Sequence, residues 1–168
     1  QTMIEAWEDP KFVTRRMVIF ASEDVGLADP SALEVALNAF RAVEVVGLPE
    51  ANYALTHATL HLALAPKSNS VALAIRAGAE AVQGGAPGEV PAHLRSGSTA
   101  GEKAMGIGVG YVYPHDAPAG VVPQQYLPDG HESLIVYRPR RVGDETEVAE
   151  RVRRIDAILG KPERSVPP

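Results

Sequence analysis

The sequence predicts a mainly α-helical domain, a helical bundle or array followed by a long loop rich in glycine and proline. Four consecutive segments repeat apolar residues at helical spacing, and short connections join them. Each of the four begins with a capping residue, a proline or both, which are signals for the start of a helix. With 168 residues, 45% of them hydrophobic, the chain is long enough to build one sizeable core.

The first two helices share one start signal. Asp9 precedes Pro10 and Asp29 precedes Pro30, so a capping carboxylate is followed by a proline at a position that needs no backbone donor. Gly47 then ends the second helix. The apolar residues that recur at helical spacing are Phe12, Val13, Met17 and Phe20 in the first helix and Leu33, Leu37 and Phe40 on one face of the second.

Two further helices follow without a long break. The third is expected from Pro49 to about Ala65, because Pro66 cannot continue it. The fourth is rich in alanine, can be capped by Ser68 and is expected to reach about Gln83.

The amino-acid composition changes after the fourth helix. Residues 84–103 are rich in glycine, proline and serine, so we expect no helix of useful length there, and the pattern does not decide whether residues 84–104 are ordered. Residues 107–113 and 133–137 are β-branched and aromatic with partial alternation. This pattern allows two short strands in an otherwise helical chain.

A last helix is expected near the end of the sequence. Asp144 or Thr146 can cap it, and Gly160 follows its final turn. The apolar residues that face one way in this helix are Val148, Val152, Ile155 and Leu159. Residues 161–168 have the composition of a flexible tail.

Composition and charge restrict the classes of function. A net charge of −5 argues against sequence-independent nucleic-acid binding over the whole surface. Without cysteine the chain can form neither a disulfide nor a cysteine-based zinc site, which suits a reducing cytoplasm. No apolar run reaches the length of a membrane span, and the first residues lack the order of a signal peptide. We therefore expect a cytoplasmic protein with no membrane partner.

Two glycine-containing stretches invite a nucleotide-binding interpretation. The glycines of GIGVGYVYPHD, at 106, 108 and 110, lack the dinucleotide-binding spacing, and Pro114 prevents the helix that should follow them. The stretch GSTAGEK, residues 97–103, has three residues between its glycines instead of four and Glu102 before the lysine. We interpret the first stretch as a segment whose glycines allow close backbone approach.

Histidines suggest two kinds of chemistry. His115 and Asp116 are adjacent, but no nucleophile elbow accompanies them, so one of the two is expected to cap the turn after Pro114. His57 and His61 have the i, i+4 spacing of two metal ligands on one helix face. The glutamate of the zinc-protease motif is absent, which leaves a metal hydrolase based on histidine as the weaker alternative.

Three polar or basic groups remain. APKSNS, residues 65–70, could hold an anion at a helix N-terminus, although capping by Ser68 alone explains most of it. The basic groups RPRR, residues 138–141, and RVRR, residues 151–154, could contact DNA phosphates, but acidic residues between them weaken a positive field. A DNA-binding or partner-binding helical module is therefore a second alternative.

Six motifs occur in a fixed order along the chain: RRMVIFASEDVGLADPSAL, VGLPEA, APKSNS, VPAHLR, YVYPHD and QQYLP. Together they resemble the C-terminal region of the RarA/MgsA family of replication-associated AAA+ ATPases, relatives of the Werner helicase-interacting protein. The resemblance runs from about Asp9 to Arg138. Its most specific parts are ASEDVGLADP and the stretch from YPHD to QYLP.

The resemblance implies a fold like the C-terminal collar domain of clamp loaders. It also implies that this chain is a fragment: residues 1–8 would end the lid domain, residues 9–160 would form the oligomerisation domain and residues 161–168 a tail. Such a domain is non-catalytic and binds no cofactor. ATP and magnesium would bind the N-terminal part of the parent protein, which the resemblance implies to be a DNA-dependent ATPase.

The resemblance further implies partners. The domain would form a homotetramer, and the full-length protein would act at stalled forks, near the nucleoid, with forked or single-stranded DNA and single-stranded DNA-binding protein. We expect no catalytic, cofactor or metal residue in the chain. The candidate structural or interface residues are Glu23, Asp24, Asp29, Pro30, Lys67, Ser68, Asn69, Tyr111, Tyr113, His115, Asp116 and Tyr126.

Overall fold

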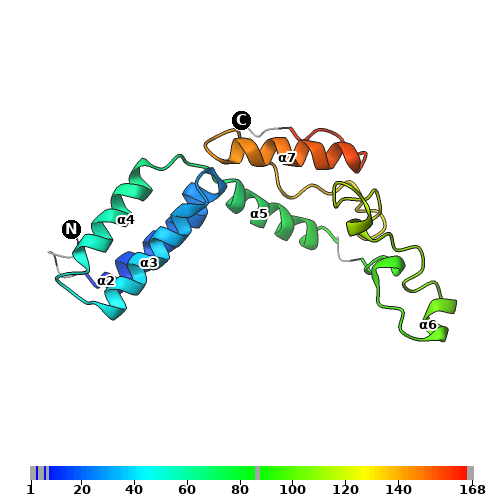
Figure 1. Ribbon diagram of the computed structural model, residues 1–168, viewed down its shortest axis with the longest axis horizontal. Helices are drawn as coiled ribbons and strands as arrows, with labels where there is room; N and C mark the ends of the chain where they lie inside the picture. Colours follow the sequence, from blue (N-terminus) through cyan, green and yellow to red (C-terminus); the bar gives the residue numbers. More distant parts are fainter. Residues whose placement is uncertain (1–2, 4–5, 7, 86–87, 166–168) are drawn as a thin grey trace.

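A computed structural model of the chain describes residues 3, 6, 8–85 and 88–165, and every regular element in these residues is a helix. The mainly α-helical prediction is therefore confirmed. The molecule is elongated and bent, with α2, α3 and α4 packed together at one end and α6 at the other (Figure 1). Most of the expected lid segment, including Ile4 and Trp7, lies outside the described residues.

The chain enters this group of helices through α2 (Pro10–Phe20). As the sequence predicts, Asp9 caps α2, and its carboxylate accepts a hydrogen bond of 2.9 Å from the amide of Lys11. A π-helical turn, η1 (Ala21–Val25), and a 3-10 turn, η2 (Gly26–Ala28), then lead out of α2. These two turns form the closed end of the helical group.

Two more helices complete an up-down-up arrangement, which we call the three-helix unit. They are α3 (Ser31–Val45) and α4 (Asn52–Leu64), and each runs antiparallel to the helix before it (Figure 1). Both are shorter than expected from the sequence by a few residues, because residues 46–51 form the turn between them. Gly47 lies in that turn with a φ of 77°, which glycine adopts without strain.

Alanine builds most of the core of the three-helix unit. Leu33 and Leu37, which the sequence places on one face of α3, are 38% and 48% exposed. The face of α3 that packs inward lies one residue earlier, about 100° around the helix. The buried apolar residues of the unit are Ala21, Val25, Ala28, Ala32, Ala36, Ala39, Val43, Ala51, Leu55, Ala58, Leu62 and Ala65. Small side chains let the helices approach closely, while the larger leucines of α3 stay at the surface.

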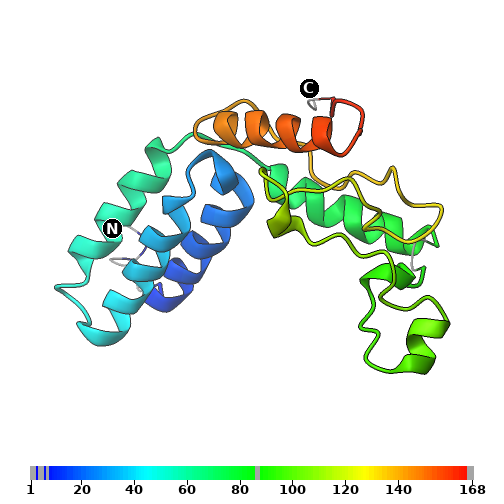
Figure 2. The same ribbon diagram turned by 45° about the vertical axis from the view of Figure 1, so that its right-hand side comes forward.

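Beyond Pro66 the chain leaves the three-helix unit through α5 (Ser70–Gln83), which points away from it in both views (Figures 1 and 2). Irregular chain follows, interrupted by the turns η3 (Ala92–Leu94) and η4 (Pro114–Asp116) and by α6 (Ala100–Ala104). The composition of residues 84–103 predicts no helix of useful length near α6. This single turn forms because Thr99 and Glu102 cap each other's backbone amides.

The two segments that the sequence allows as strands, residues 107–113 and 133–137, are irregular. Gly106, Gly108 and Gly110 all have positive φ values, between 72° and 86°, so the chain turns where a strand would need extended residues. The expected close approach is present, since a Cβ on Gly108 would lie 3.1 Å from the backbone nitrogen of Gly97 and 3.2 Å from the carbonyl oxygen of Arg95. The neighbour is another segment of loop.

The last helix, α7 (Glu145–Ile158), returns to the bend of the molecule and begins beside η2. Its predicted apolar face, from Val148 to Leu159, is half-buried. The sequence predicts that Asp144 or Thr146 caps α7. Within the described part of the chain, the side chain of Asp144 makes no capping hydrogen bond. Near its end, Asp156 is buried and binds Arg164 through two hydrogen bonds of 2.7 and 2.8 Å.

Candidate functional site at the helical junction

The bend of the molecule is a junction of backbone hydrogen bonds between segments far apart in sequence. The amide of Ser68 donates to the carbonyl of Asp24 at 2.8 Å, and the amide of Asp144 donates to the carbonyl of Ala28 at 2.9 Å. Both carbonyls belong to the closed end of the three-helix unit. We call this region the junction; it comprises η1, η2 and residues 66–70 and 143–145. It sets the directions in which α5 and α7 leave the unit.

A buried carboxylate joins α7 to the start of α5. Glu145, the first residue of α7, is fully buried. One of its carboxylate oxygens accepts from the hydroxyl of Ser68 and the other from Tyr137 at 2.8 Å. The position at a helix N-terminus also favours a negative charge. Because a buried carboxylate is costly without partners, this cluster specifies where α7 docks.

The same cluster perturbs Tyr137. Burial, together with the hydrogen bond and the charge of Glu145, raises the pKa of the Tyr137 hydroxyl far above its ordinary value of 10.0. The phenol therefore stays protonated and keeps donating to Glu145 over the whole physiological range. The carbonyl of Tyr137 also accepts 2.8 Å from Arg164, so the tail is tied to the junction.

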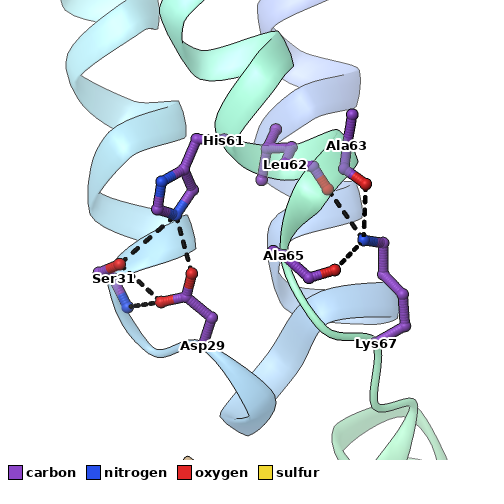
Figure 3. Close-up of polar contacts among 7 residues, drawn as sticks. All are labelled: Asp29, Ser31, His61, Leu62, Ala63, Ala65 and Lys67. Carbon is purple, nitrogen blue, oxygen red and sulfur yellow. Dashed lines mark hydrogen bonds and ion pairs between the residues drawn. The ribbon is translucent and has the colours of Figure 1, made fainter. Parts of the chain in front are cut away.

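A second polar cluster lies at the start of α3 (Figure 3). One oxygen of Asp29 accepts from the amide and the hydroxyl of Ser31, at 3.0 and 2.6 Å, and the other lies 2.9 Å from Nε2 of His61. The carboxylate of Asp29 thus caps the amide of Ser31 at the start of α3, as predicted, while Pro30 lies just before the helix. The Ser31 hydroxyl, the Ser31 amide and His61 together hold the pKa of Asp29 below its usual value.

The same cluster bears on the predicted histidine pair of α4, His57 and His61. His61 turns towards Asp29, which lies just before α3, whereas His57 is exposed one turn earlier on α4. Residues 3, 6, 8–85 and 88–165 contain no group of three histidines and acidic residues placed to hold a metal ion. The geometry therefore offers the metal-hydrolase alternative no support.

We expect Asp29→Ala to destabilise the chain by about 1 kcal/mol, the usual effect of losing a helix cap. The folded-state pKa of Asp29 lies below the ordinary value of 3.8, so its contribution is present above that pH and is lost as the pH falls through the folded pKa. Urea unfolding of both proteins at pH 7 and near pH 3 measures this. A difference that stays constant between the two pH values would contradict the assignment.

Lys67 lies in the junction, but its ammonium points to the C-terminus of α4 (Figure 3). An anion would instead need a helix N-terminus. Its ammonium donates to the carbonyls of Leu62, at 2.9 Å, and of Ala65, at the C-terminus of α4. It also lies 5.7 Å from the ring centre of Phe20. A cation at a helix C-terminus is favourable, so Lys67 caps α4. The lysine of residues 65–70 is therefore not directed at the anion site that the sequence allows there.

The structure separates the candidate residues into two groups. Those from Glu23 to Asn69 lie at or beside the junction. The others lie in the loops: Tyr113 and His115 contact each other at 5.0 Å between ring centres, and the Gln124 amide bonds the Tyr126 hydroxyl at 3.2 Å. The expected side-chain cap at η4 is not formed by the described residues. Tyr111 is 47% exposed in the same region.

The basic groups near the end of the chain are partly neutralised. Arg153 pairs with Glu150 at 2.8 Å, and Arg141 lies 3.9 Å from the same carboxylate. This agrees with the expectation that acidic neighbours weaken the positive field. None of the described helices has the length and apolarity to cross a membrane.

Comparison with known proteins gives consistent matches. The chain matches the family model of the MgsA AAA+ ATPase C terminal over residues 1–156. It is 50% identical over 159 residues to a AAA domain-containing protein of Mycobacterium tuberculosis, covering 95% of this chain and 35% of that protein. It is 42% identical over 141 residues to the replication-associated recombination protein A of Bacillus subtilis, covering 84% and 33%. For the Escherichia coli K12 protein of that name the identity is 38% over 151 residues, covering 89% and 34%. The chain spans about a third of the length of these relatives.

Proposed function

Since the chain belongs to the MgsA family of AAA+ ATPases and matches its C-terminal region, we propose that it is the non-catalytic self-association domain of a replication-associated recombination ATPase. In this proposal, ATP and magnesium bind elsewhere in the parent protein. Forked or single-stranded DNA and single-stranded DNA-binding protein likewise interact through the full-length protein, at stalled forks. The domain itself holds the ATPase modules together.

The observation that carries the proposal is an excess of exposed surface. The chain has an accessible surface of 10,886 Å². A compact monomer of its mass, 17.8 kDa, exposes about 8,000 Å². The excess of roughly a third is larger than a standard interface buries on one partner. An elongated chain with this much surface is suited to assembly with other chains.

The kind of surface supports the same proposal. Large apolar side chains are exposed on all three helices of the three-helix unit and on α5, including Leu37, Tyr53, Leu64 and Ile75. Exposed apolar area of this extent is typical of interaction surfaces. Closed symmetry is expected for copies of one chain, because a contact that fails to close makes filaments. The tetramer is the order that the family resemblance implies.

Self-association is expected to appear directly in the mass of the purified chain. Light scattering across a hundredfold range of concentration should give a multiple of 17.8 kDa at the upper end, and a homotetramer is the expected limit. Burial of the exposed apolar side chains drives the association. A mass that stays at one chain at the highest concentration overturns the proposed function.

A further inference from the structure

We propose that a second copy of this chain docks on one exposed face of α4. This face, here named the α4 ridge, consists of Tyr53, His57, Leu60 and Leu64. The inference rests on the proposed self-association and assigns a contact surface and a register to it.

The ridge lies on the side of α4 that faces away from the core. Its four residues follow one another at intervals of four, three and four, which places them on one helix face. The buried residues of α4, Leu55, Ala58 and Leu62, occupy the opposite face. Helix α4 is therefore apolar on both sides, and such a helix is typically buried on both sides.

The exposure of the ridge is the largest that apolar side chains reach in the described part of the chain. Tyr53 is 85% exposed and Leu64 is 84% exposed, and these are the two highest values among the exposed large hydrophobic residues. Leu60, between them, is 58% exposed. The three apolar side chains, with His57 between Tyr53 and Leu60, extend over about three turns of α4.

The absence of charge on α4 indicates which partner fits. The sequence of α4, NYALTHATLHLAL, contains no Asp, Glu, Lys or Arg. A two-fold contact brings a helix against its own copy, so any charge near the axis would meet a like charge. A ridge without Asp, Glu, Lys or Arg avoids this repulsion. It also offers no complement to a charged partner such as nucleic acid, whose phosphates require basic side chains.

The order of residues along the ridge is self-complementary in the antiparallel direction. If two copies of α4 cross near the middle of the ridge, Tyr53 of each copy meets Leu64 of the other, and His57 meets Leu60. The same register brings Glu50, before α4, towards Lys67 of the other copy, after its α4. Opposite charges then flank the apolar contact, and the helix dipoles run antiparallel. A parallel pairing would place Glu50 against Glu50.

The first test compares the double variant Leu60→Glu, Leu64→Glu with the double control Met105→Glu, Val109→Glu. Met105 and Val109 are 71% and 57% exposed, so the control adds two charges at comparably exposed apolar positions in the irregular chain beyond α5, outside the ridge. We expect the ridge variant to lower the mass of the assembly by half or more in light scattering, because self-association would bury four new charges in each contact. The control should keep the wild-type mass. Circular dichroism should show unchanged helix content in both, since neither site is buried.

The outcomes separate the inference from the proposed function. If the wild-type chain associates and the ridge variant has the same mass, the ridge is not the contact surface, and self-association stands. A ridge that binds a different protein would give this result. A wild-type chain that is monomeric throughout overturns both.

The register is tested with cysteines, because the chain has none of its own. Chains carrying Tyr53→Cys are mixed with chains carrying Leu64→Cys and oxidised. We expect disulfide-linked pairs that join one chain of each kind, in clear excess over pairs of two Tyr53→Cys chains. Predominant linkage between two Tyr53→Cys chains would overturn the antiparallel register, and the absence of any linkage in an associated sample would overturn the contact.

Discussion

Replacing Gly143 by alanine is expected to destabilise the chain by about 3–5 kcal/mol, more than any other single methyl addition at the junction. A Cβ at this position would lie 2.2 Å from the carbonyl oxygen of Ala28 and 2.6 Å from Cγ of Pro66. Gly143 also has a φ of 53°, which costs a residue with a Cβ additional strain. The chain can relieve the clash only by moving α7 away from the three-helix unit.

Gly160→Ala is the matched control for this change. Gly160 has a similar φ of 65°, but nothing lies within 4 Å of the Cβ that alanine would add. The control therefore carries the backbone strain without the clash, and we expect it to cost about 1–2 kcal/mol. Urea unfolding measures the two differences. If both variants lose the same amount, the close approach of Gly143 to Ala28 is not a constraint on the fold.

Removing the buried carboxylate at the start of α7 is the second large effect that we expect. Glu145→Ala leaves the buried hydroxyl of Ser68 and the half-buried hydroxyl of Tyr137 without their acceptor and opens a cavity where the carboxylate was. Losing a buried charged partner of this kind costs about 2–4 kcal/mol. Glu145→Gln retains the volume and one acceptor, so its cost should be smaller.

The exposed neighbour Glu147 supplies the control, since Glu147→Ala removes a carboxylate from the same turn of α7 without touching the cluster. Chemical denaturation gives the loss of stability. Hydrogen exchange of the α7 amides then shows whether the helix opens separately from α2–α4. Equal losses for Glu145→Ala and Glu147→Ala would show that the buried cluster contributes nothing to the docking of α7.

Local start signals explain why the helices could be predicted. Asp9 with Pro10 and Asp29 with Pro30 act on the amides next to them, so the sequence contains the whole interaction. The choice of the buried face was harder. Alanine is apolar but small, and Leu33 and Leu37 lie at the same helical spacing, so the pattern of α3 does not reveal which of the two faces packs inward.

The junction could be predicted only in part, because its interactions connect distant segments. The sequence predicts a cap at Ser68, but the main partner of Ser68, Glu145, is 77 residues away and looks like an ordinary acidic residue in a first helical turn. For Tyr137 the sequence pattern allows a strand. Its β-favouring neighbours describe a local preference, whereas its position is decided by the contacts of its hydroxyl and carbonyl.

The alanine core of the three-helix unit has a thermodynamic consequence. The heat capacity of unfolding grows with the apolar area that unfolding exposes, and alanine contributes less area than leucine or phenylalanine. The isolated chain should therefore have a small heat-capacity change and a broad, shallow dependence of stability on temperature. The larger apolar side chains lie outside, so association should add a heat-capacity change of its own. Calorimetry of the dissociation that follows dilution of the assembled chain should detect this heat-capacity change, as an enthalpy of dissociation that rises steeply on warming.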